Sequence, residues 1–520
     1  LNACTPRSLC GRAIEAALDP SVYLATPITA LVKFGLMVNR TSYMQPLAQM
    51  LESTYADPYD IQKKLYGIEN YIKNANLDRQ NLLETEAKLV EEDKLSALAE
   101  EITAQTETQE DEVGEITGAA ADIDELEIIQ KPELTPDILL EDFKPQSPIV
   151  DSMRTALFDN PEIDKSIWNE LSIWNRSFAK RIKTSSVAIV PERDEYKFRY
   201  ILQKDKNAPL IILYPSIGEG YNTHHSTVFA KMFFDEGYSI VMLGSHFHWE
   251  FVRIMPEGYC PGIPSQDADN IKLVTHKILD KLENKYECKF DEKIIIGTSF
   301  GALSSLFVAE KESKNNTLGI TKYIAISPPV ELVYAVEQLD KNSDELDNNS
   351  PEVKHKTAVT AAKILQITKM KENNPDMNIS ALPFTEQEGK LITTFLLRQK
   401  LSDLIFTIEN IAKGQKTDIY EAINNMSYRD YVEKYLLNGS SLENMRYETS
   451  LYSLADYLVN NDNYRIYHSP DDFFATEGQI KRLKTLAGKH LVCVSNGSHL
   501  GFLYRKEFQE ALKADVLGKI

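Results

Sequence analysis

Short, uninterrupted apolar runs recur along the chain from about residue 186, and amphipathic helical stretches separate most of them. Leu210 to Leu213 and Ile294 to Ile296 are two such runs. Strands without polar positions are buried on both faces, which is typical of parallel sheets with helices on each side. We expect strands at 186–190, 197–202, 210–214, 239–243, 293–296, 322–326, 465–467 and 490–494. We expect helices at 224–236, 267–283, 300–312, 477–486 and 506–513. The predicted fold class is α/β, with a mostly parallel central sheet flanked by helices.

The interval 331–459 carries no convincing strand, although it lies between two predicted strands of the sheet. Its apolar periodicity instead predicts helices, most clearly over 353–370 and 386–411. We therefore expect one core in two parts, 147–330 and 460–520, separated by an inserted helical cap at 331–459.

The chain before residue 147 differs in composition from the predicted core. Residues 1–83 show apolar positions at helical spacing, so we expect an N-terminal helical module that packs on the core or binds a surface. From Glu84 to Asp142 there are 20 acidic residues and three lysines, which is most of the formal charge of −20. Such a stretch repels itself and can bury little apolar area, so we expect a disordered linker at 84–146. Nucleic-acid binding is not expected, because it needs clustered Lys and Arg.

The N-terminus carries a possible lipidation signal. No run of 18 or more apolar residues is present, so no membrane-spanning helix is predicted. The start, Leu1-Asn2-Ala3-Cys4, resembles the lipobox of bacterial lipoproteins, in which the cysteine is lipidated after a signal peptide is removed. If Cys4 is lipidated, we expect the protein on a bacterial envelope membrane; without lipidation, we expect it in the cytoplasm.

The segment Gly297-Thr-Ser299-Phe-Gly301 follows one predicted strand directly and opens the next predicted helix. A serine at such a tight strand-to-helix turn has a strained backbone and an exposed hydroxyl, and the small residues around it let neighbouring elements approach. The helix N-terminus also offers backbone N–H groups to a developing negative charge. Ser299 is therefore the predicted nucleophile.

A serine needs a base to act as a nucleophile at neutral pH. His499 lies on a glycine-flanked loop after the last predicted strand, so it can reach Ser299 at the same end of the sheet. The loop after the preceding strand carries two adjacent carboxylates, Asp471 and Asp472, either of which could orient the imidazole. Only one of them can point toward it, and we favour Asp472.

The serine, the acid and the histidine, in this order along the chain, resemble the α/β-hydrolase superfamily over both predicted parts of the core. The resemblance implies an oxyanion hole made of two backbone N–H groups. One belongs to Phe300, the residue after the nucleophile. The other comes from the loop at 214–220, from Ile217 or, as the close alternative, from Gly218, although this loop lacks the His-Gly pair that many relatives carry there. The superfamily also carries a cap where the helical insertion is expected.

Other histidines have two interpretations each. His224 and His225 are adjacent, so their side chains diverge on a helix, and no third ligand accompanies them; no metal site is predicted. His246, His248 and Trp249 follow a predicted strand and either line the pocket or form a packed aromatic loop. The chain has no glycine-rich phosphate loop, and no cofactor is expected.

The sequence therefore predicts a serine hydrolase that forms an acyl-enzyme on a carboxylic ester or a related acyl substrate. Apolar side chains of the insertion, such as Leu404 and Ile405, either admit an apolar acyl chain beneath the cap or pack on the core. Two alternatives remain open. One is an acyltransferase, in which an alcohol or amine replaces water. The other is a catalytically silent interaction protein within a larger complex, with the N-terminal module or the cap binding a protein partner.

Overall fold

A computed structural model of the chain describes residues 134–160, 162–163, 178–344, 381–409, 426–437 and 439–518, with five isolated positions at 353, 356, 360, 363 and 423. The predicted N-terminal module, most of the predicted linker and Cys4 lie outside these residues. No helix in the described part of the chain is long and apolar enough to span a membrane.

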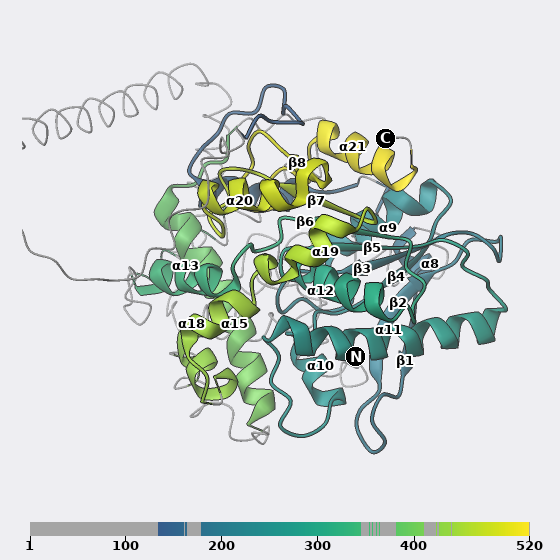
Figure 1. Cartoon of the computed structure of the whole chain (residues 1–520). Coiled ribbons are helices and arrows are strands. Elements are labelled where there is room, and N and C mark those ends of the chain that lie inside the picture. The colour runs from purple at the N-terminus through teal and green to yellow at the C-terminus, as the bar shows by residue number, and fades with distance from the viewer. Residues whose placement is uncertain are drawn as a thin grey trace, which may run out of the picture. The chain divides into compact units, whose positions relative to one another are not determined.

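The core is an eight-stranded sheet with the strand order β1-β2-β4-β3-β5-β6-β7-β8 (Figure 1). The strands are β1 (Lys183–Val187), β2 (Tyr196–Ile201), β3 (Leu210–Tyr214), β4 (Ser239–Met242), β5 (Lys293–Thr298), β6 (Lys322–Ile326), β7 (Tyr464–His468) and β8 (Leu491–Cys493). From β4 to β8 the neighbours are parallel, whereas β2 is antiparallel to both β1 and β4. Each predicted strand is present, with ends shifted by a few residues, so the mostly parallel sheet is confirmed.

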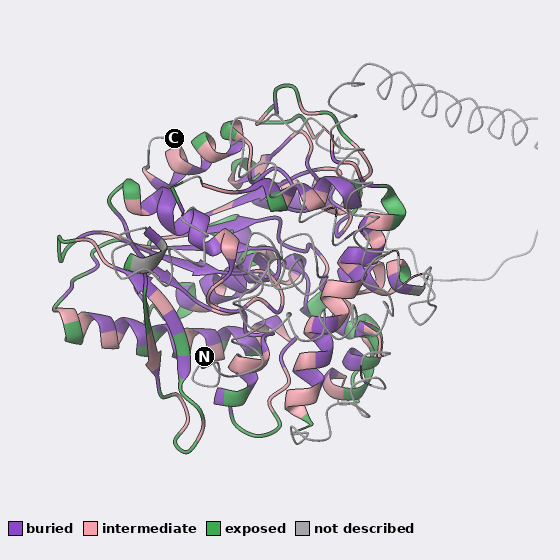
Figure 2. Cartoon of the chain, turned by 180° about the vertical axis from the view of Figure 1, so that it is seen from behind, coloured by how far each residue is buried: buried purple, intermediate pink, exposed green. Residues whose placement is uncertain are grey.

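Helices cover both faces of this sheet, which explains the uninterrupted apolar strands. Leu210 and Ile212 face one core, and Ile211 and Leu213 face the other. The first core is completed by α10 (Trp249–Ile254), α11 (Pro264–Tyr286), α12 (Phe300–Lys314) and α20 (Glu477–Ala487). The second is completed by α8 (Phe178–Arg181), α9 (His224–Asp235) and α21 (Lys506–Val516). Figure 2 shows the strands buried between these layers. The chain has the α/β-hydrolase fold that the resemblance implied.

Between β6 and β7 the described residues are helical, as expected. The elements are α13 (Leu332–Asp344), α15 (Glu386–Ile408), α17 (Tyr428–Tyr431), η4 (Val432–Leu436), α18 (Leu442–Glu448), η5 (Leu451–Leu454) and α19 (Ala455–Asn460). We call residues 331–459 the helical insertion. Leu404 and Ile405 are fully buried in the first core. Of the two interpretations given above, this is the one in which these side chains pack on the core.

The prediction of a disordered linker at 84–146 is wrong for its last residues, 134–146, which contact the core. The backbone N–H groups of Asp137 and Ile138 donate to the Cys493 carbonyl at 2.8 and 3.0 Å, and Ile138 forms a parallel bridge with Val494. Leu140 is buried. A few apolar residues at the end of an acidic segment are enough to dock it, although its average composition indicates disorder. The chain continues through α6 (Pro148–Met153) and η2 (Arg154–Leu157). We call residues 137–157 the N-terminal strap.

Candidate active site

Ser299 occupies the turn between β5 and α12 with φ 52° and ψ −122°, a conformation that non-glycine residues rarely adopt. The turn is possible because two glycines leave room for it. A Cβ on Gly297 would lie 2.5 Å from the Gly301 carbonyl oxygen, and a Cβ on Gly301 would lie 2.4 Å from the Pro215 carbonyl oxygen. The approach of neighbouring elements expected from the small residues is confirmed. The strained turn presents the hydroxyl at the carboxyl end of β5.

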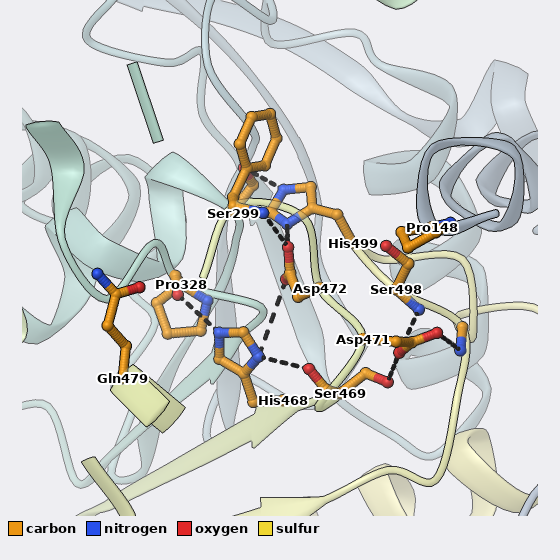
Figure 3. Close-up of polar contacts among 12 residues, drawn as sticks. Pro148, Ser299, Pro328, His468, Ser469, Asp471, Asp472, Gln479, Ser498 and His499 are labelled. Carbon is orange, nitrogen blue, oxygen red and sulfur yellow. Dashed lines mark hydrogen bonds and ion pairs between the residues drawn. The ribbon is translucent and has the colours of Figure 1, made fainter. Parts of the chain in front are cut away.

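His499 reaches this hydroxyl from the loop after β8, with its Nε2 2.8 Å from Ser299 Oγ (Figure 3). The loop is sharply bent, because both residues beside the histidine, Ser498 and Leu500, have positive φ angles of 49° and 65°. The serine and histidine are 200 residues apart in sequence, and both side chains are largely buried. The arrangement lets the imidazole accept the hydroxyl proton.

Asp472 lies on the other side of the imidazole, with its two carboxylate oxygens 2.9 and 3.1 Å from His499 Nδ1. The carboxylate also accepts the Phe474 backbone N–H at 2.9 Å. Burial alone would raise the pKa of Asp472, but the charge that His499 carries once it is protonated and these hydrogen bonds outweigh it and hold the pKa below its usual value. The group is therefore an anion that fixes the Nδ1–H tautomer of His499.

Asp471 points away from the imidazole and supports the histidine loop instead. Its carboxylate accepts the backbone N–H groups of Gly497 at 3.3 Å and Ser498 at 3.0 Å, and the Ser469 hydroxyl. Figure 3 shows the two aspartates diverging from one turn. Of the two alternatives left open by the sequence, the geometry brings Asp472, and not Asp471, to His499.

The two residues expected to supply the oxyanion donors, Phe300 and Ile217, both line one apolar cavity. Phe300 is the first residue of α12, so its backbone N–H has no acceptor within the helix. Ile217 lies in a turn closed by the Glu219 N–H donating to the Ser216 carbonyl. The side chains of Ile217 and Phe300 both line the cavity. Gly218 has φ 63° in this turn, and a Cβ there would lie 2.8 Å from Lys400 Cβ.

The remaining histidines have structural partners. His246 stacks on Phe300 with ring centroids 4.7 Å apart, and His248 accepts the Glu250 N–H at 3.3 Å to cap α10. Burial lowers the pKa of His248 to about 3 and that of His225 to about 4, so both rings are neutral at pH 7. Among the described residues no group of three or more potential ligands is arranged to hold a metal ion.

The N-terminal strap holds the histidine loop, a role that the sequence analysis missed. The His499 backbone N–H donates to Ser152 Oγ at 3.0 Å, and this hydroxyl also lies 2.9 Å from the Pro148 carbonyl and 3.2 Å from Ser498 Oγ. A Cβ on Gly501 would lie 2.0 Å from the Asp151 carbonyl oxygen, which shows how closely the strap and the loop approach. No pattern around Ser152 signals this contact, because it joins segments 347 residues apart.

Comparisons with known proteins give low sequence identities and low TM-scores. No protein-family model and no curated protein sequence matches the chain. An esterase of Pyrococcus furiosus, Pf2001, is 11% identical, with 64% of this chain and 88% of that chain covered and a TM-score of 0.35. A carboxyl esterase of Bacillus coagulans is 11% identical, with coverages of 65% and 98% and a TM-score of 0.34. Brefeldin A esterase, a bacterial homologue of human hormone-sensitive lipase, is 12% identical, with coverages of 73% and 88% and a TM-score of 0.36. At these values, the fold assignment rests on the strand order and the turn geometry described above.

Proposed function

We propose that this chain, with its α/β-hydrolase fold, is a serine hydrolase that cleaves a carboxylic ester through an acyl-enzyme. The observation that carries the proposal is the continuous chain of contacts from Ser299 Oγ through His499 to the Asp472 carboxylate, with distances of 2.8 and 2.9 Å. Nucleophile, base and orienting acid are the three parts that acyl transfer by serine requires.

The reaction follows in two steps. Ser299 Oγ attacks the carbonyl carbon while His499 Nε2 takes the hydroxyl proton, and Asp472 stabilises the resulting imidazolium. The negative charge on the carbonyl oxygen is stabilised by the backbone N–H groups of Phe300 and Ile217. The ester C–O bond then breaks, and the leaving alcohol takes the proton from His499. Water repeats the sequence on the acyl-enzyme, which releases the carboxylic acid and restores Ser299.

The cavity lined by Phe300, the residue after Ser299, supports the proposal of a short, apolar acyl group. Its volume is about 40 Å³, and its walls come from the core and from the helical insertion. The walls are mainly apolar: Ile217, Phe247, Phe300, Leu332, Val333, Val336, Tyr428, Tyr431, Val432, Leu436, Leu442 and Met445 line it, with Gly262, Glu337 and Arg429. This volume holds about three water-sized groups, which suits a short chain. In this proposal the helical insertion acts as a cap over the acyl group.

Active-site labelling tests the nucleophile. A fluorophosphonate probe is expected to label the wild type and to leave Ser299→Ala unlabelled, because only an activated serine attacks the phosphorus. Wild-type protein that folds but resists the probe would favour the silent interaction protein. Labelling that persists in Ser299→Ala would assign the nucleophile elsewhere. Adding an alcohol or amine to the ester assay distinguishes a hydrolase from an acyltransferase. An acyltransferase would form the transfer product in preference to the free acid.

A series of esters tests the cavity. We expect acetyl to butyryl esters to have higher kcat/KM than octanoyl esters, and Leu436→Ala to raise the octanoyl-to-acetyl ratio about tenfold, because it removes part of the wall. Leu437→Ala is the matched control, since Leu437 is the next residue and does not line the cavity. An unchanged octanoyl-to-acetyl ratio in Leu436→Ala would show that the acyl group does not bind in this cavity.

A further inference from the structure

His468 lies directly beneath the acid of the site and takes no part in the reaction proposed above. It is the last residue of β7 and is fully buried. Its Nε2 lies 3.0 Å from the Pro328 carbonyl oxygen. Its Nδ1 lies 3.2 Å from the Ser469 carbonyl oxygen and 3.8 Å from an Asp472 carboxylate oxygen. In Figure 3 the ring lies between these three groups.

All three neighbours of the ring are hydrogen-bond acceptors. A neutral imidazole has one N–H and one bare nitrogen, so it can satisfy an acceptor on one side only. If Nε2 carries hydrogen for Pro328, a bare Nδ1 would face the oxygens of Ser469 and Asp472 with its lone pair. A ring with hydrogen on both nitrogens turns a donor toward all three oxygens, and the ring is then a cation.

The charge of Asp472 gives a second, independent reason. Asp472 is 3% exposed, and a buried carboxylate is costly unless a cation accompanies it. His499 must be neutral before the reaction in order to accept the proton of Ser299, so it cannot supply that cation in the resting state. Among the described residues, His468 is the basic side chain that approaches Asp472 from the side opposite the nucleophile.

We propose that His468 is a positioning residue of the triad, held doubly protonated between Pro328, Ser469 and Asp472. It neutralises the Asp472 carboxylate in the resting enzyme. Its positive charge also opposes protonation of His499, so His499 stays an active base at lower pH. The inference rests on the proposed function for its catalytic effect, whereas the protonation state of the ring does not depend on activity.

Other titratable groups near the ring are few in the described structure. Asp471 and Asp472 lie on the same loop, and His499 comes from the loop after β8. Tyr334 of α13 lies within electrostatic range of Asp472. Asp471 is satisfied by Gly497, Ser498 and Ser469, so the charge that faces His468 directly is that of Asp472.

Nitrogen NMR of histidine rings measures the protonation state directly. Protein with ¹⁵N-labelled histidine is recorded at pH 7 to 8, and the His468 signals are those absent from His468→Gln, or from His468→Asn if the glutamine variant does not fold. We expect both ring nitrogens of His468 to carry hydrogen. One protonated and one bare nitrogen would overturn the proposal, even in a protein that shows no activity toward any ester.

The pH dependence of kcat/KM measures the effect on the triad. His468→Gln keeps a donor for Pro328 and removes the charge, so we expect the acid limb to move up by about half to one pH unit. On the acid side this lowers kcat/KM three- to tenfold. The matched control is His490→Gln, at the amino end of β8, where the ring contacts Tyr464 O and Asp462 at 3.2 and 2.9 Å. An acid limb that stays in place in His468→Gln, or that moves equally in both variants, would overturn the catalytic part while leaving the serine hydrolase assignment standing.

Discussion

Exchanging the two neighbouring aspartates for asparagine separates the acid of the triad from a supporting carboxylate. Asp472 receives the His499 Nδ1–H at 2.9 Å, whereas Asp471 receives the backbone N–H groups of Gly497 and Ser498. Asp472→Asn keeps the shape but offers the imidazole an amide, which favours the wrong tautomer and removes the charge that stabilises the imidazolium. We expect kcat to fall about 10³- to 10⁴-fold, equivalent to about 4 to 5.5 kcal/mol in the activation barrier.

Asp471→Asn is the matched control for this experiment. It keeps one oxygen for the backbone donors but loses the charge, so we expect the free energy of unfolding to fall by about 1 to 2 kcal/mol and kcat to fall less than tenfold. Both variants are compared in kcat/KM with a butyryl ester and in thermal unfolding. A loss of activity in Asp471→Asn as large as that in Asp472→Asn, or nearly full activity in Asp472→Asn, would refute the assignment of the acid.

Three further perturbations follow from the same contacts. The pKa of Asp472 is lower in the folded state than in the unfolded state. The stability that this carboxylate contributes is therefore complete above the unfolded pKa of about 3.9 and is lost as the pH falls through the lower folded pKa. In denaturant titrations from pH 5 to 2, the wild type should lose more stability than Asp472→Asn. Gly301→Ala places a Cβ 2.4 Å from the Pro215 carbonyl oxygen and should lower the free energy of unfolding in denaturant by about 1 to 3 kcal/mol. In the control Gly478→Ala in α20, the added Cβ has no atom closer than 3.9 Å, so this variant should be as stable as the wild type or more stable. Equal effects of the two variants would contradict the packing described for the turn. Ser152→Ala removes the acceptor of the His499 N–H and should lower kcat about tenfold with little change in KM; unchanged kcat would show that the strap does not position the histidine.

The sheet and the turn at Ser299 could be predicted from sequence because each depends on local patterns. Burial on both faces produces runs such as Ile294 to Ile296, and these runs located β3, β5 and β6 almost to the residue. The glycines around Ser299 are required by contacts with the adjacent turn and strand, so they remain visible as a short motif. His499 and the aspartate pair were found through their positions after predicted strands.

Other parts of the site could not be predicted, because they depend on contacts between distant segments. Ser152 lies in a segment without a motif, and only the folded chain brings it to His499. The sequence analysis favoured Asp472 over Asp471, although the local sequence does not reveal the turn that directs the two carboxylates to different partners. His468 was not singled out, since nothing in its sequence neighbourhood indicates that three acceptors surround its ring. The docked end of the strap was hidden by the acidic average of the longer segment.

Trapping the acyl-enzyme tests the central claim most directly. Protein mixed with a butyryl ester is quenched in acid within the first turnovers, and its intact mass and peptides are measured. We predict a butyryl group on the peptide that contains Ser299 and no adduct in Ser299→Ala. Ester turnover without any covalent adduct on Ser299, or an adduct on another residue, would contradict the claim.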